Sequence, residues 1–147
     1  MGSFVLDTSI ALKWLLEAEG DCAYSLAILE AITDGYRPVV PCLWYYEIES
    51  AILVQVPRKL IVFEQSVDYL KIVDEIVIDT DPPDCSAILH LPHLARAHNL
   101  AGYYAAFLEL AIRLQLPLAT NDQVLVLAAM GTKVKLLKIP GATLPFS

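Results

Sequence analysis

Short apolar runs separated by longer amphipathic segments recur along the whole chain. The short runs predict buried strands at residues 4–6, 39–40, 75–79, 116–119 and 134–137. In the longer segments, apolar residues stand three or four positions apart, which predicts helices over residues 22–33, 43–54, 62–73, 84–98, 103–115 and 123–130. A further helix follows the first strand, and Thr8 or Ser9 is its expected N-cap.

This order of elements favours one fold class. Strands that alternate with helical segments are typical of a parallel sheet covered by helices on both faces. We therefore predict a three-layer α/β/α fold with a central parallel sheet. Pro92 interrupts the segment 84–98, so we expect a kink or two shorter helices there. Because no linker, repeat or low-complexity stretch divides the chain, residues 1–147 are predicted to form a single domain.

The composition excludes several classes of protein. Hydrophobic residues make up 56% of the 147 residues and charged residues only 18%, which excludes intrinsic disorder. The apolar runs, such as 124–130, are much shorter than the roughly 18–20 residues that span a bilayer, so we expect no membrane segment. The opening Met-Gly-Ser lacks the charged region of a signal peptide. Three widely spaced cysteines are typical of buried free thiols, and we predict a cytoplasmic protein.

The charge balance is acidic, with 17 acidic and 10 basic residues and a net charge of −7. Such a chain lacks the basic field of non-specific nucleic-acid-binding proteins. An acidic balance is nevertheless compatible with a local cluster of carboxylates that binds a metal ion.

Three acidic residues stand where such a cluster would form. Asp7 ends the first predicted strand, Asp122 follows the strand at 116–119, and Glu47 lies in the first turns of the helix after the second strand. Ligands of open α/β sheets bind at the carboxyl ends of the strands. Clustered carboxylates suit Mg²⁺ or Mn²⁺, which can activate water and stabilise a phosphodiester transition state. Each acid also has an ordinary alternative, as a helix cap or as a solvent-exposed charge.

Four blocks of the chain resemble a known family. Residues 4–14, Phe-Val-Leu-Asp-Thr-Ser-Ile-Ala-Leu-Lys-Trp, resemble the opening of PIN-domain proteins, especially the VapC-type toxins of bacterial toxin–antitoxin pairs. Residues 41–48 resemble the second block of that family, residues 100–113 the third and residues 116–122 the last. The four blocks occur in the family's order and spacing.

The resemblance implies a PIN fold and Mg²⁺- or Mn²⁺-dependent endoribonuclease activity. In that family a quartet of acids holds the metal; its first, second and last members correspond here to Asp7, Glu47 and Asp122, which would be both catalytic residues and metal ligands. Ser9 and Thr120 correspond to positions whose hydroxyls support the cluster.

The third acid of the quartet is missing. Where the family reads Tyr-Asp-Ala-Ala, this chain reads Tyr-Tyr-Ala-Ala, so Tyr104 stands at the acidic position. A neutral phenol is a poor Mg²⁺ ligand, and no nearby acid replaces it: Glu109 points about 140° away on an ideal helix. We expect the nuclease activity to be weakened or lost. Two alternatives stay open: three acids still hold one Mg²⁺, or a catalytically degenerate PIN module binds RNA or a protein partner.

The family resemblance also implies partners. Lys13, one turn beyond the first acid, is the best candidate for contacting an RNA phosphate. Homodimerisation and an antitoxin that covers the active site are implied as well. A phospho-receiver domain is a competing interpretation, since Asp79 or Asp81 could follow the third strand; a nucleotide-binding domain is disfavoured because no glycine-rich loop follows the first strand.

Overall fold

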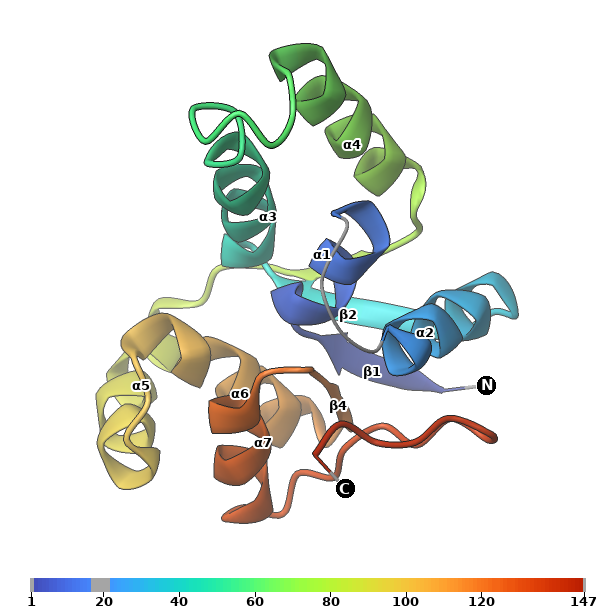
Figure 1. Cartoon of the computed structure of the whole chain (residues 1–147). Helices are drawn as coiled ribbons and strands as arrows, with labels where there is room; N and C mark the ends of the chain where they lie inside the picture. The colour runs from blue at the N-terminus through green and yellow to red at the C-terminus, as the bar shows by residue number, and fades with distance from the viewer. Residues whose placement is uncertain (1, 17–21, 147) are drawn as a thin grey trace.

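The computed structural model describes residues 2–16 and 22–146 (Figure 1). In this part of the chain the strands are β1 (Ser3–Leu6), β2 (Arg37–Pro41), β3 (Asp79–Asp81) and β4 (Leu118–Ala119). The helices are α1 (Thr8–Leu15), α2 (Ala23–Thr33), α3 (Leu43–Leu53), α4 (Phe63–Glu75), α5 (Cys85–His98), α6 (Gly102–Leu114) and α7 (Gln123–Met130).

The strands form one parallel sheet in the order β3-β2-β1-β4. The chain builds outward from β1 to β2 and β3, then crosses back over the sheet to β4. Because parallel crossovers are right-handed, the reversal of direction sends the later helices to the opposite face. Helices α1 to α4 accordingly lie on one side of the sheet and α5 to α7 on the other (Figure 1). The predicted three-layer α/β/α fold is confirmed.

The register between β1 and β4 positions the acids. β1 pairs with β4 so that Leu6 stands beside Ala119, and the next residues on the two strands, Asp7 and Thr120, are therefore neighbours. The backbone N–H of Asp7 donates to the carbonyl of Ala119 at 2.9 Å, which extends the pairing by one step. This pair of strands is also where the connections leave the sheet in opposite directions, the usual position of a ligand site in open α/β sheets.

The central strand is buried on both faces. Phe4, Val5 and Leu6 have no exposed surface, because helices cover both sides of β1. Trp44 from α3 and Phe107 from α6 are equally buried on the helices that cover them. This burial explains why the run at 4–6 is continuously apolar and does not alternate.

Two of the predicted strands differ in the structure. The strand predicted at 75–79 is instead Asp79–Asp81, because α4 continues to Glu75 and the pairing with β2 uses the later residues. The strand predicted at 134–137 is reduced to a single bridge between Leu118 and Leu136. With only two residues in β4, the ladder has no partner over which to extend.

Of the two outcomes expected at Pro92, a kink or two shorter helices, the second is not observed. α5 runs through Pro92 as one helix from Cys85 to His98. Pro92 lacks the N–H that would bond to the carbonyl of Ile88. Among its described residues α5 has no buried side chain, so solvent can reach that carbonyl.

Two smaller expectations are corrected. The N-cap of α1 is Asp7, whose side chain accepts from the N–H of Ser9, and not Thr8 or Ser9. The three cysteines, expected to be buried, are not: Cys85 is exposed, and Cys22 and Cys42 are half-buried. No helix in residues 2–16 or 22–146 is long and apolar enough to cross a membrane.

Candidate functional site

A cavity of about 420 Å³ opens at the carboxyl ends of β1 and β4, between α3 and α6. All three predicted acids line it, together with Tyr104 at the position of the missing acid. Its lining consists of Asp7, Thr8, Ser9, Leu12, Glu47, Ser50, Ala51, Val54, Tyr103, Tyr104 and Asp122.

Asp7 forms the floor of this cavity and is 2% exposed. Its Oδ2 accepts hydrogen bonds from the hydroxyl of Ser9 and, at 2.7 Å, from the hydroxyl of Thr120. Burial raises the pKa of the Asp7 carboxyl, the bonds from Ser9 and Thr120 lower it, and the charge of Asp122 raises it; the net direction is upward. The predicted supporting hydroxyls therefore contact the first acid directly.

The loop after β4 is tied to the same two hydroxyls. The N–H of Asn121 donates to Ser9 Oγ at 2.9 Å, and the N–H of Asp122 donates to Thr120 Oγ1 at 3.0 Å. The Asp122 carboxylate in turn caps α7, accepting from the N–H of Val124 at 2.8 Å. This network of hydrogen bonds joins the ends of β1 and β4.

Glu47 reaches the cavity from α3. Burial, and then the charge of Asp7, raise the pKa of Glu47 to about 7. Its Oε1 atom is buried and has no hydrogen-bond partner, and neither has the buried hydroxyl of Thr8 on the same cavity wall. Buried polar atoms are almost always paired. The two unpaired oxygens among the lining residues therefore favour a cation or a polar ligand as their partner.

Tyr104, which stands at the position of the missing third acid, lines the same cavity. Burial raises the pKa of its phenol to about 12, and Asp122 contributes through its charge and as the acceptor of a hydrogen bond from the phenol. The ring stacks at a tilt on Tyr103, with centroids 4.8 Å apart. Tyr104 and Asp122 are thus neighbours in the lining of the cavity.

The structure does not assemble a complete metal centre. In residues 2–16 and 22–146, no group of three or more histidine, cysteine, aspartate or glutamate side chains is placed to hold a metal ion. Among the residues that the structure describes, no acid besides Asp7, Glu47 and Asp122 lines the cavity. Glu109 and Asp81 instead accept from the guanidinium of Arg113, at 2.7 Å each. Lys13, the predicted phosphate contact, is not among the lining residues either.

The sequence analysis missed two residues behind the site. Asn121 Nδ2 donates to Ser25 Oγ at 2.6 Å, and Ser25, on α2, is fully buried. The carbonyl of Ser25 also accepts from Trp14 Nε1 at 2.7 Å. A serine within the apolar segment 22–33 was the available signal, since a buried hydroxyl needs a partner.

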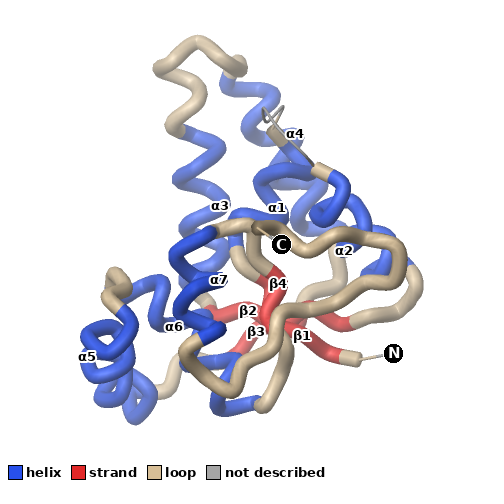
Figure 2. Tube along the Cα trace, turned by 60° about the horizontal axis from the view of Figure 1, so that its bottom comes forward, coloured by secondary structure: helices blue, strands red, loops and turns tan. Residues whose placement is uncertain are grey.

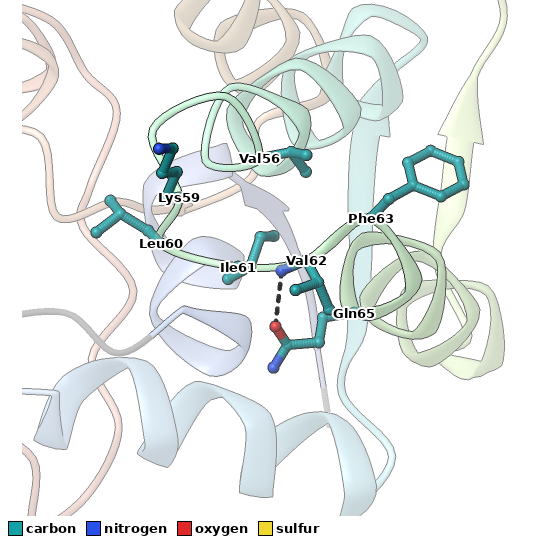
Figure 3. A pocket seen from close by; sticks show the side chains of 7 residues that line it. All are labelled: Val56, Lys59, Leu60, Ile61, Val62, Phe63 and Gln65. Carbon is teal, nitrogen blue, oxygen red and sulfur yellow. Dashed lines mark hydrogen bonds between the residues drawn. The ribbon is translucent and has the colours of Figure 1, made fainter.

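A second hollow lies apart from the acids, in the segment between α3 and α4 (Figure 3). Its surface is largely apolar: Leu60, Val62 and Phe63 are 58–68% exposed. Gln65 folds back so that its Oε1 accepts from the N–H of Val62 at 2.9 Å (Figure 3). In the tube view of Figure 2, α3 and the loop that follows it project beyond the sheet. Exposed apolar patches of this kind mark contact surfaces.

Comparison with known families decides the identity of the fold. The family model for the PIN domain matches residues 4–129, which include β1, β4 and all the acids of the cavity. The chain belongs to the PIN domain family. This result disfavours the phospho-receiver interpretation, in which Asp81 would have to be available at the end of β3, where it is instead bound by Arg113. No match is found among curated proteins.

Solved structures share this PIN fold at low sequence identity. The crystal structure of PAE2754 from Pyrobaculum aerophilum superposes with a TM-score of 0.65 at 20% identity, covering 91% of this chain and 82% of that one. VapBC2 from Rickettsia felis, bound to a DNA fragment from its promoter, gives 0.65 at 16% identity, covering 93% and 98%. VapBC-1 from nontypeable Haemophilus influenzae gives 0.61 at 17% identity, covering 94% and 98%.

Proposed function

We propose that this PIN domain is a VapC-type toxin of a toxin–antitoxin pair, with a metal-dependent endoribonuclease site that Tyr104 weakens. The observation that carries the proposal is the cavity wall itself, where Glu47 Oε1 and the hydroxyl of Thr8 are buried without partners beside Asp7. An apolar ligand would leave these oxygens unpaired. A divalent cation with its water shell would satisfy them.

The residues present fit a weakly held ion. Asp7 and Glu47 would hold Mg²⁺ or Mn²⁺, and Mg²⁺ is often bound through only one or two carboxylates. Such an ion, when bound, would activate water and stabilise the charge of a phosphodiester transition state. The charge of Asp7 disfavours ionisation of Glu47. A cation bound between the two carboxylates would relieve this repulsion, which favours binding.

The chain's own side chains have distinct roles in this proposal. Ser9 and Thr120 hold Asp7 by one oxygen, which fixes the direction of its carboxylate. Tyr104 acts against the site, because its phenol donates to Asp122 and its ring takes the volume of the missing acid. Losing one carboxylate lowers the negative charge that attracts the ion.

A second candidate function follows from the same contact. If Tyr104 keeps Asp122 from the other acids, the domain becomes a catalytically degenerate PIN module that binds RNA or a protein partner. The absence of a grouped set of three ligands among the described residues favours this candidate.

Protein partners enter the proposal through the surface of the α3–α4 segment. Two structures that share the fold, VapBC2 and VapBC-1, support an antitoxin as a partner of this chain. We propose that this apolar surface, which includes Leu60, Val62 and Phe63, contacts an antitoxin or a second copy of the chain.

The test is a metal titration and an RNA-cleavage assay on the native chain, Tyr104→Asp and Glu47→Gln. We expect slow cleavage by the native chain, a gain of at least about tenfold in Tyr104→Asp, and loss in Glu47→Gln. If the native chain cleaves as fast as Tyr104→Asp, Tyr104 does not weaken the site. If Tyr104→Asp binds no metal and cleaves no RNA, the degenerate module is the better description.

A further inference from the structure

Tyr103 lines the same cavity as the buried Asp7, yet it is 53% exposed. One face of its ring is supported by Tyr104, at a centroid distance of 4.8 Å and an interplanar angle of 34°. This distance is within the range of favourable aromatic pairs. The tilted pair therefore presents a backed aromatic surface at the entrance to the site.

The charges around the cavity make such a surface significant. All ten lysines and arginines of the chain lie in the described part, and none of them lines the cavity. Three carboxylates do, so the cavity cannot hold a polyanion through ion pairs with its own walls. A nucleic-acid strand bound here needs a source of affinity other than basic side chains.

We propose that Tyr103 stacks on an unpaired nucleobase of single-stranded RNA whose backbone crosses the acidic cavity. This inference rests on the proposed function, and it adds a residue of the cavity lining that positions the substrate. Base–aromatic stacking tolerates any base, since each has a flat π-face, and it needs no charge. Bases inside a duplex already stack on their neighbours, which excludes them from Tyr103 and restricts the contact to single strands.

The experiment uses the full chain and a mixed-sequence RNA 12-mer with 2-aminopurine placed at successive positions. Stacking quenches 2-aminopurine fluorescence, fluorescence anisotropy gives the affinity, and a gel of the same samples reports cleavage. The variants are Tyr103→Ala, Tyr103→Phe and the control Tyr46→Ala. Tyr46 is a matched control because it is a tyrosine that is 73% exposed and does not line the cavity.

We expect quenching at one or two positions and a loss of affinity in Tyr103→Ala of about 5- to 150-fold, the range of one stacked base. Tyr103→Phe keeps the ring and should bind within about twofold of the native chain. Tyr46→Ala should bind the single strand as tightly as the native chain does. The matched duplex should bind Tyr103→Ala and the native chain with the same affinity. Thermal unfolding of each variant controls for folding.

Three results would overturn the inference. If Tyr103→Ala binds the single strand as tightly as the native chain does and quenching persists, Tyr103 does not stack, while cleavage on the gel would leave the proposed function standing. If Tyr103→Ala instead weakens only the capture of a protein partner, the ring is a protein contact. A native chain that neither binds nor cuts the 12-mer overturns both the inference and the proposed function.

Discussion

The hydroxyl of Thr120 donates to Oδ2 of Asp7 at 2.7 Å, joining the ends of two neighbouring parallel strands inside the protein. Thr120 is fully buried and Asp7 is 2% exposed, so solvent cannot replace this bond if it is lost. The contact exists because the strand register places Leu6 beside Ala119.

Thr120→Val should therefore destabilise the fold by about 1–3 kcal/mol, the cost of leaving a buried acceptor poorly satisfied. The bond lowers the pKa of Asp7, so it stabilises the ionised form. The loss should be larger at pH 8 than at pH 4, because acid removes the charge that the bond supports. Urea denaturation at both pH values measures it, and Thr120→Ser should recover most of the stability. An equal loss at both pH values would show that Asp7 keeps one protonation state throughout.

Glu47→Gln should change the pH dependence of stability in a defined window. Because the folded-state pKa is about 7 against an ordinary 4.5, the folded chain keeps this proton while the unfolded chain loses it between these pH values. The free energy of unfolding then falls as pH rises from about 4.5 to 7, and the penalty remains above that. In the absence of metal, Glu47→Gln should be more stable than the native chain at pH 8 and equal to it near pH 4.

Glu49→Gln is the matched control, since Glu49 is exposed on the same helix and does not line the cavity. Thermal unfolding across the pH range compares the two variants. A difference between Glu47→Gln and the native chain that does not vary with pH would show that Glu47 does not titrate in this window.

Substitutions at Tyr104 should rank by how much negative charge they leave free. Tyr104→Phe removes the donor to Asp122 but keeps the ring, and Tyr104→Asp removes the ring and adds a carboxylate. We expect Mn²⁺ affinity to rise in the order native, Tyr104→Phe, Tyr104→Asp, as measured by isothermal titration calorimetry. An unchanged affinity in Tyr104→Phe would mean that the ring's volume, and not the hydrogen bond, limits the site.

Arg113→Met should loosen the edge of the sheet. Arg113 bonds to Asp81 of β3 at 2.7 Å and to Glu109 of its own helix at 2.7 Å, connecting the edge strand to α6. The side chain of Arg113 is 35% exposed, so we expect a loss of only about 1 kcal/mol. Hydrogen exchange should locate the added opening at β3, and Arg113→Lys should restore part of the protection. Unchanged exchange at β3 would show that pairing with β2 alone holds the strand.

The sequence by itself determined most of the architecture. Continuous apolar residues at 4–6 predict a strand buried on both faces, and β1 is that strand. The spacing of apolar residues also predicted the helices of the described part of the chain, whose bounds differ from the predicted ones by few residues. The positions of Asp7, Glu47 and Asp122 at strand ends were also sufficient to bring all three to one cavity.

Only the tertiary structure decided features that depend on pairing and exposure. The segment 134–137 is apolar enough for a strand but finds only a two-residue neighbour, so a single bridge forms. Pro92 stays within one helix because α5 buries none of its side chains and solvent reaches the freed carbonyl. The approach of the unpaired oxygens of Thr8 and Glu47 to one cavity depends on how α1 and α3 meet. Such contacts join residues distant in the chain, and no local pattern of hydrophobic and polar positions encodes their geometry.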